Sequence, residues 1–155
     1  MNKRCVMETI ADRLAGDLAL LHKAAREAHA EATHESSKAE NKYDTRGLEA
    51  SYLADGQVRQ AIETEEAIAQ IQMLSMADLP PGTAVTLGAL VELESRGRTM
   101  FYFMAPRGGG VEVEVDGEEV VVLTPQSPLG RLLVGKKEDD CFKSPSGNSR
   151  VVRCW

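Results

Sequence analysis

Apolar residues recur along the first part of the chain with the spacing of one helical face. From about Glu8 to Thr33 they are separated by alternating steps of four and three residues, which places them in one stripe. The stripe consists of Ile10, Leu14, Leu18, Leu21, Ala25, Ala28 and Ala32. Its members change from Leu and Ile to Ala toward residue 35, so a partner helix could approach closely there. The pattern predicts a helix on the order of 40 Å long.

A second helical stripe follows the polar segment "THESSKAENKYDTRG". It consists of Leu48, Tyr52, Val58, Ile62, Ala69, Met73 and Met76, with Asp55 and Glu66 on the same face. Two helical stretches joined by a short polar connection pack most simply as an antiparallel coiled-coil hairpin. We therefore predict a first domain over residues 1–79, with an acidic tip near 35–46 and the second stripe in its seam.

The pattern changes to period two after "ADLPPGTAV", where tandem prolines end the helix. Alternating or β-branched runs follow, and "VEVEVDGEEVVVL" contains the Asp-Gly pair typical of a tight β-hairpin. In "SPLGRLLVGKK", Ser127 is expected to cap a helix that starts at Pro128 and stops before Gly135, with Leu129, Leu132 and Leu133 packing inward. Residues 80–155 are thus predicted to form a small antiparallel sheet with one helix, and the fold class is α+β.

Composition and charge narrow the possible functions. Residues 1–79 carry 9 Lys and Arg against 14 Asp and Glu, which disfavours direct binding to nucleic acid through its phosphates. Three cysteines without a CxxC spacing indicate neither a disulfide framework nor a zinc site. No apolar run is long enough to span a bilayer and acids interrupt the apolar positions near the N-terminus, so we expect a cytoplasmic protein without membrane contact.

The segment "LTPQSPLGRLLVGKKEDD" resembles the C-terminal domain of the GreA/GreB family of bacterial transcript cleavage factors. The resemblance extends to an N-terminal antiparallel coiled coil, a proline-marked linker, and a tip carrying Glu-Asn and a following Tyr, here Glu40, Asn41 and Tyr43. It implies an FKBP-like C-terminal domain that docks on the rim of the secondary channel of RNA polymerase. It also implies that the strand-to-helix junction with Gln126, Ser127 and Pro128 faces the polymerase.

The same resemblance implies that the factor has no active site of its own. The coiled coil would reach down the channel, and acids at its tip would help hold a Mg²⁺ ion while the polymerase cleaves backtracked RNA, so contact with the RNA 3′ end is indirect. Carboxylates suit this role because Mg²⁺ prefers oxygen ligands. The candidates in this chain are Glu40 and Asp44, which share a face if the segment is helical. No intrinsic cofactor is expected, and a hairpin that buries its own seam predicts a monomer.

Two positions depart from the family pattern. Ser37 stands where GreA and GreB carry an Asp, three residues before the tip Glu, and Gln126 stands where GreB has an acid. Some relatives of this family, such as Rnk and inhibitors that compete with Gre factors, also bind polymerase. They lead us to expect a changed tip together with an unchanged docking surface. Stimulation of RNA cleavage is therefore the leading hypothesis, and a competitor that binds the channel without stimulating cleavage is the alternative.

The sequence also leaves open purely structural roles for these residues, an enzymatic function, and an adaptor function. The tip acids could simply solvate a hairpin end, Asn41 could cap the second helix, and Ser127 and Pro128 could be caps only. Arg131 is the fourth residue that we predict to dock on the polymerase, although it could also be a solvated side chain that meets no acidic partner surface. An FKBP-like sheet also allows prolyl isomerase activity, but only five aromatic residues are available to line a proline pocket. They are Phe101, Tyr102, Phe103, Phe142 and Trp155. A coiled-coil adaptor without affinity for polymerase is the third possibility.

Overall fold

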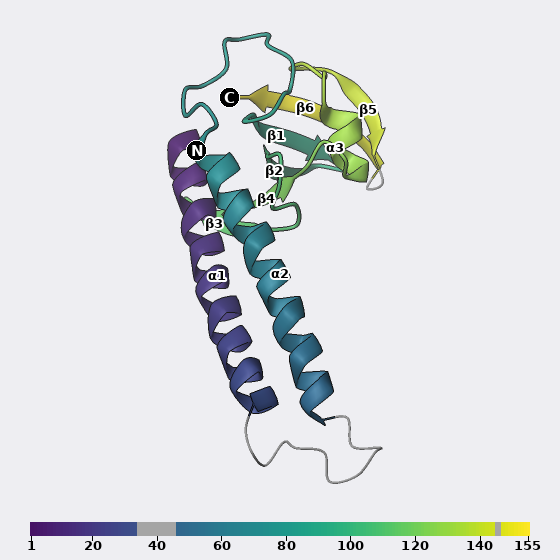
Figure 1. The fold of residues 1–155 in the computed structure, drawn as a ribbon. Helices are drawn as coiled ribbons and strands as arrows, with labels where there is room; N and C mark the ends of the chain where they lie inside the picture. The colour runs from purple at the N-terminus through teal and green to yellow at the C-terminus, as the bar shows by residue number, and fades with distance from the viewer. Residues whose placement is uncertain (34–45, 145–146) are drawn as a thin grey trace. The chain divides into compact units, whose positions relative to one another are not determined.

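The computed structural model describes residues 1–33, 46–144 and 147–155 (Figure 1). The chain divides into two compact units. One, which we call the helical unit, comprises residues 14–66, and the other, the sheet unit, comprises residues 1–13 and 67–155. The start of the first long helix and the end of the second therefore group with the sheet. The predicted boundary between residues 79 and 80 stays a prediction.

Two long helices precede the sheet, α1 from Lys3 to Thr33 and α2 from Arg46 to Gln72. In the helical unit the predicted stripe of α1 faces inward, since Leu14 and Ala28 are buried and Leu18 is half-buried. A side-chain contact joins the two helices, with His22 Nε2 at 3.5 Å from Glu65 Oε1. The predicted long first helix and its apolar face are confirmed.

The stripe predicted for α2 does not form the seam of the hairpin, so that prediction was wrong. Leu48, Tyr52 and Ile62 are 55%, 68% and 50% exposed, whereas Ala54 and Ala61 are buried. Alanine allows two helices to pack closely, so a narrow hairpin buries the small side chains of α2 and leaves its larger ones outside. Met73 and Met76 lie beyond the end of α2 and are exposed.

The sheet has six strands in the order β3-β4-β2-β1-β6-β5 (Figure 1). Their bounds are Leu90–Ser95 for β1, Arg98–Met104 for β2, Glu112–Val115 for β3, Glu118–Leu123 for β4, Cys141–Ser144 for β5 and Gly147–Cys154 for β6. Neighbouring strands are antiparallel except β2 and β4, which run parallel. The α+β fold with a mostly antiparallel sheet is confirmed, while the parallel pair and the short edge strand β5 were not anticipated.

Local sequence chemistry explains the sharp turns of the sheet. Asp116 and Gly117 both have positive φ angles, 57° and 81°, which is the backbone of a two-residue hairpin turn between β3 and β4. Arg96 and Gly97 repeat this pattern between β1 and β2, with φ angles of 52° and 72°. The Asp-Gly hairpin is therefore confirmed.

A single short helix, α3 from Pro128 to Leu133, packs against the core of the sheet unit. Leu133 is fully buried and the half-buried Leu129 packs on the same core cluster, which includes Leu93 and Met104. Leu132 is 38% exposed, so its predicted inward packing was wrong. It directly precedes Leu133 on a helix of little more than one turn, so the two side chains cannot share a face. In the described chain, no helix is apolar over the length that crossing a membrane requires.

Candidate functional site

The junction between β4 and α3 forms a corner of the sheet unit, which we call the α3 corner and define as Gln126, Ser127, Pro128 and Arg131. Ser127 is the N-cap of α3, and its Oγ accepts a hydrogen bond of 3.0 Å from the backbone N–H of Gly130. The same hydroxyl donates to the carbonyl oxygen of Thr124 at 2.8 Å. Pro128 occupies the first helical position, where its missing N–H costs nothing. The predicted cap is confirmed.

Gly130 allows the first turn of α3 to pack closely against the end of β4 at the α3 corner. A Cβ atom at this position would lie 2.7 Å from Ser127 Oγ, 2.9 Å from the carbonyl carbon of Thr124, and closer still to the Thr124 oxygen. Any side chain would therefore push the first turn of α3 away from the end of β4. Sequence reasoning missed this role, because the contact involves a backbone whose position is set by the turn over residues 124–127.

The α3 corner presents a mixed polar and apolar surface. Gln126, Pro128 and Arg131 are exposed, and Pro128 and Arg131 lie three residues apart on one face of α3. Leu132 and Val134 add exposed apolar side chains beside them. The structure thus brings the four predicted docking residues together, with a rigid cap beneath a cationic group and exposed apolar area. This combination suits docking against a protein surface better than enclosing a small molecule.

The predicted tip residues Glu40, Asn41, Tyr43 and Asp44 lie outside the described residues, as does Ser37. Their predicted role at a Mg²⁺ ion therefore stays a prediction. Within residues 1–33, 46–144 and 147–155, no group of three or more His, Cys, Asp or Glu side chains is arranged to hold a metal ion.

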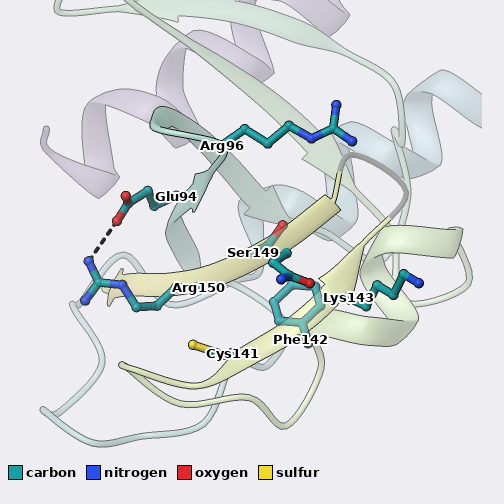
Figure 2. A pocket seen from close by; sticks show the side chains of 8 residues that line it. Glu94, Arg96, Cys141, Phe142, Lys143, Ser149 and Arg150 are labelled. Carbon is teal, nitrogen blue, oxygen red and sulfur yellow. Dashed lines mark hydrogen bonds and ion pairs between the residues drawn. The ribbon is translucent and has the colours of Figure 1, made fainter.

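A surface hollow of about 470 Å³ lies over β1, β5 and β6 (Figure 2). Arg150 crosses it, with Nη2 at 2.8 Å from Glu94 Oε2 and Nη1 at 3.2 Å from Asp139 Oδ1. Its hydrogen bond to Glu94 and the charge of that carboxylate raise the pKa of Arg150. Both carboxylates already bind the guanidinium. Arg150 therefore links β6 to Glu94 of β1 and to Asp139, and is not a free anion ligand.

The hollow was not visible in the sequence. Its lining comes from segments about 50 residues apart, brought together by the pairing of β1 with β6 and of β6 with β5. The one available signal was the alternation of "RVVRCW", which places Arg150 away from the buried Val151. Alternation identifies the exposed face of a strand, but it does not identify the carboxylates that lie opposite.

Two titratable side chains, those of Lys3 and Cys154, are buried in the sheet unit. Lys3 is only 2% exposed, and its Nζ donates a 2.7 Å hydrogen bond to the carbonyl oxygen of Ala77. Burial lowers the pKa of Lys3, and the charge of Asp78 partly opposes this effect. Burial, with a smaller contribution from Glu138, raises the pKa of the Cys154 thiol from 9.0 to about 11. Cys154 is therefore neutral and unreactive at physiological pH.

Similarity to known proteins covers both the helices and the sheet. The transcription elongation factor GreA of Methylococcus capsulatus is 30% identical over an alignment of 155 positions that covers 95% of this chain and 92% of that protein. This chain belongs to the GreA family of transcription elongation factors. The family resemblance predicted from "SPLGRLLVGKK" is thereby confirmed, and it extends over nearly the whole chain.

Solved structures with a similar chain include GreA factor homologs from two Thermus species. Homolog 1 of Thermus thermophilus is 24% identical, with 94% of each chain covered and a TM-score of 0.38. Gfh1 of Thermus aquaticus is 20% identical, with 95% of this chain and 94% of that chain covered and a TM-score of 0.36. No family model matches this GreA-family chain.

Proposed function

We propose that this GreA-family chain binds RNA polymerase and modulates the polymerase active site, stimulating the cleavage of backtracked RNA. The observation that carries the proposal is the match to a transcription elongation factor over 95% of the chain. In this proposal the chain has no active site of its own. One copy docks on the rim of the secondary channel through the α3 corner and places the tip of its hairpin inside the channel.

The α3 corner supports the docking half of the proposal. The hydrogen bond from the backbone N–H of Gly130 to Ser127 Oγ fixes its backbone, so little conformational freedom is lost when it binds a partner. Arg131 is exposed and can offer a planar, two-pronged donor to a carboxylate on the partner surface. Pro128 contributes exposed apolar area at the same corner.

The acids at the tip support the second part of the proposal, that the chain stimulates RNA cleavage by the polymerase. Glu40 and Asp44 are four residues apart and provide carboxylate oxygens, the ligand type that Mg²⁺ prefers. When bound, the ion would polarise phosphate oxygens and activate water for hydrolysis. In the proposal, the two carboxylates help hold the ion against the polymerase, while Asn41 and Tyr43 contact neighbouring groups in the channel.

Ser37 favours one alternative function. It stands where GreA and GreB carry an Asp, so this tip offers one carboxylate fewer on that side. A chain with an intact α3 corner and a weaker tip would occupy the channel without stimulating cleavage, and would compete with true cleavage factors. The two functions share a docking mode and differ only in what the tip does.

Stalled complexes with backtracked, end-labelled RNA distinguish the two. We expect Mg²⁺-dependent shortening of the RNA to rise when the full chain is added, and to fall with Glu40→Ala. Ser37→Asp is the matched gain-of-function variant, since it restores the family's acid and should increase cleavage further. Binding without cleavage by the wild-type chain, together with loss of cleavage by an added GreA, would support the competitor instead.

Docking is tested separately by direct binding to polymerase. Arg131→Glu should weaken binding about tenfold, because it reverses the charge of an exposed contact at the α3 corner. Arg98→Glu at the start of β2 makes the same charge change on another exposed Arg of the sheet unit and should bind as the wild type does. Equal loss of binding in both variants would indicate a general effect of net charge and would contradict docking through the α3 corner.

A further inference from the structure

The exposed face of α2 in the helical unit carries a second heptad-like seam. Its positions are separated by alternating steps of four and three residues, the spacing of a and d positions in a coiled coil. They are Leu48, Tyr52, Asp55, Arg59, Ile62 and Glu66, and all six are exposed. The buried face of α2 is lined by Ala54 and Ala61, so the apolar members of this seam, Leu48, Tyr52 and Ile62, are not buried within the hairpin.

The middle of the seam is hollow and charged. Gly56 leaves a surface hollow of about 500 Å³, with Tyr52, Asp55 and Arg59 along its rim, and a Cβ at Gly56 would meet nothing within 4 Å. In the described part of the chain, the side chains of Asp55 and Arg59 make no hydrogen bond or ion pair with another described residue. The seam thus offers room for a side chain and two opposite charges without partners.

The four central residues of the seam, Tyr52, Asp55, Arg59 and Ile62, form a complementary set when the sequence is read in reverse. If two copies of α2 run antiparallel about a twofold axis at the level of residue 57, position 52 of one lies beside position 62 of the other, and position 55 lies beside position 59. Each Tyr52 then packs on the Ile62 of the second copy, and each Asp55 faces the Arg59 of the second copy. The twofold axis makes every one of these contacts twice.

We propose that the outer face of α2 is an interface with a second copy of this chain, which pairs there as an antiparallel coiled coil. Two Asp55–Arg59 layers at the centre set the register, and Tyr52–Ile62 layers on either side supply the apolar burial. A charged layer inside a coiled-coil seam is a known means of specifying register, at some cost in affinity. In this proposal the free chain pairs instead of staying the monomer expected from the sequence, an expectation that assumed that α2 buries its stripe inside the hairpin.

A second copy fits this face better than an unrelated apolar partner does. Any partner that covered Tyr52 and Ile62 with apolar groups alone would also cover Asp55 and Arg59 and leave both charges without partners, which is costly. An antiparallel second copy satisfies both charges with no further residue. The separation of Asp55 and Arg59 by four residues matches one turn of helix, so the two charge pairs lie side by side across the axis.

Sedimentation equilibrium of the full chain, without polymerase, tests the pairing by exchanging charges. The wild type should show a reversible monomer–dimer equilibrium. Asp55→Arg alone places Arg opposite Arg, and Arg59→Asp alone places Asp opposite Asp, so each variant should raise the dimer dissociation constant about tenfold or more. An equimolar mixture of the two variants should recover association as a heterodimer, because every charge then meets its opposite.

The controls separate this pairing from general adhesion. Ala19→Arg adds a positive charge to an exposed position of α1, away from the seam, and should leave the dissociation constant unchanged, while Tyr52→Ser should weaken the dimer. All substituted positions are exposed, and circular dichroism checks that helix content is kept. A wild type that stays monomeric at its highest soluble concentration, or single variants whose mixture does not recover association, would overturn the proposal. Since polymerase is absent, neither result bears on the proposed function, and the cleavage assay does not bear on the dimer.

Discussion

Replacing Gly130 by alanine should destabilise the sheet unit, even though alanine is the better helix former. Gly130 lies in α3 and is fully enclosed by the end of β4 and the cap of the helix. An added methyl group would overlap the Thr124 carbonyl group and approach Ser127 Oγ to 2.7 Å. Atoms of these types normally stay beyond about 3.0–3.4 Å, so either α3 or the turn before it must shift.

The magnitude follows from three opposing contributions. Forcing a methyl group into a packed position costs about 1–3 kcal/mol. Moving Ser127 away from the backbone N–H of Gly130 loses the N-cap, a further cost of about 1 kcal/mol. The higher helix propensity of alanine returns at most about 1 kcal/mol. The net expectation is a loss of about 2 kcal/mol in the free energy of unfolding.

Urea denaturation followed by the fluorescence of Trp155 measures this loss. Trp155 is the single tryptophan, is buried in the sheet unit, and lies 4.8 Å from the guanidinium of Arg153, so its emission reports on unfolding of that unit. With a urea dependence of about 2 kcal/mol per molar, the midpoint of Gly130→Ala should fall by about 1 M.

Gly16→Ala is the matched control, because Gly16 is also helical but a Cβ there meets nothing within 4 Å. This variant should stabilise the helices by about 0.5–1 kcal/mol, as judged by circular dichroism. If Gly130→Ala were as stable as the wild type or more stable, while Gly16→Ala behaved as expected, the close approach of α3 to β4 would be refuted.

Three further predictions concern residues of the sheet unit. Ser127→Ala should cost about 1 kcal/mol by removing the cap of α3, and Ser127→Thr should retain most of it, as measured by urea midpoints. In native protein at pH 8, an alkylating reagent should modify the exposed Cys5 and Cys141 rapidly and Cys154 only after unfolding, and mass spectrometry of the peptides would contradict this if Cys154 reacted early. Because the folded-state pKa of Cys154 is raised from 9.0 to about 11, its neutral thiol stabilises the fold fully below pH 9, and this contribution is lost as the pH rises toward 11. Cys154→Ala should therefore lessen the fall in stability between pH 8 and 11 by about 2 kcal/mol, and an unchanged pH profile would contradict the assignment.

Much of the fold could be predicted from the sequence because its determinants are local. The Asp116-Gly117 pair requires only backbone freedom at two adjacent residues, and the Ser127 cap requires only a hydroxyl three residues before a free N–H. The same local chemistry explains why the four residues of the α3 corner could be predicted together. They lie within six consecutive positions, so a single turn and a single cap place them all.

The choice of buried face on α2, the roles of Gly130 and Arg150, and the parallel pairing of β2 with β4 were decided only by tertiary structure. A helical stripe such as that through Tyr52 and Ile62 shows that a face is apolar, but not which surface covers it. Between two apolar faces, the narrow hairpin buried the one with alanines, because helix separation and not hydrophobicity alone sets what fits. The sequence by itself determined the local conformations, the helix and strand periods and the family. Which surfaces meet depends on distances between segments far apart in the chain, and these distances exist only once the chain has packed.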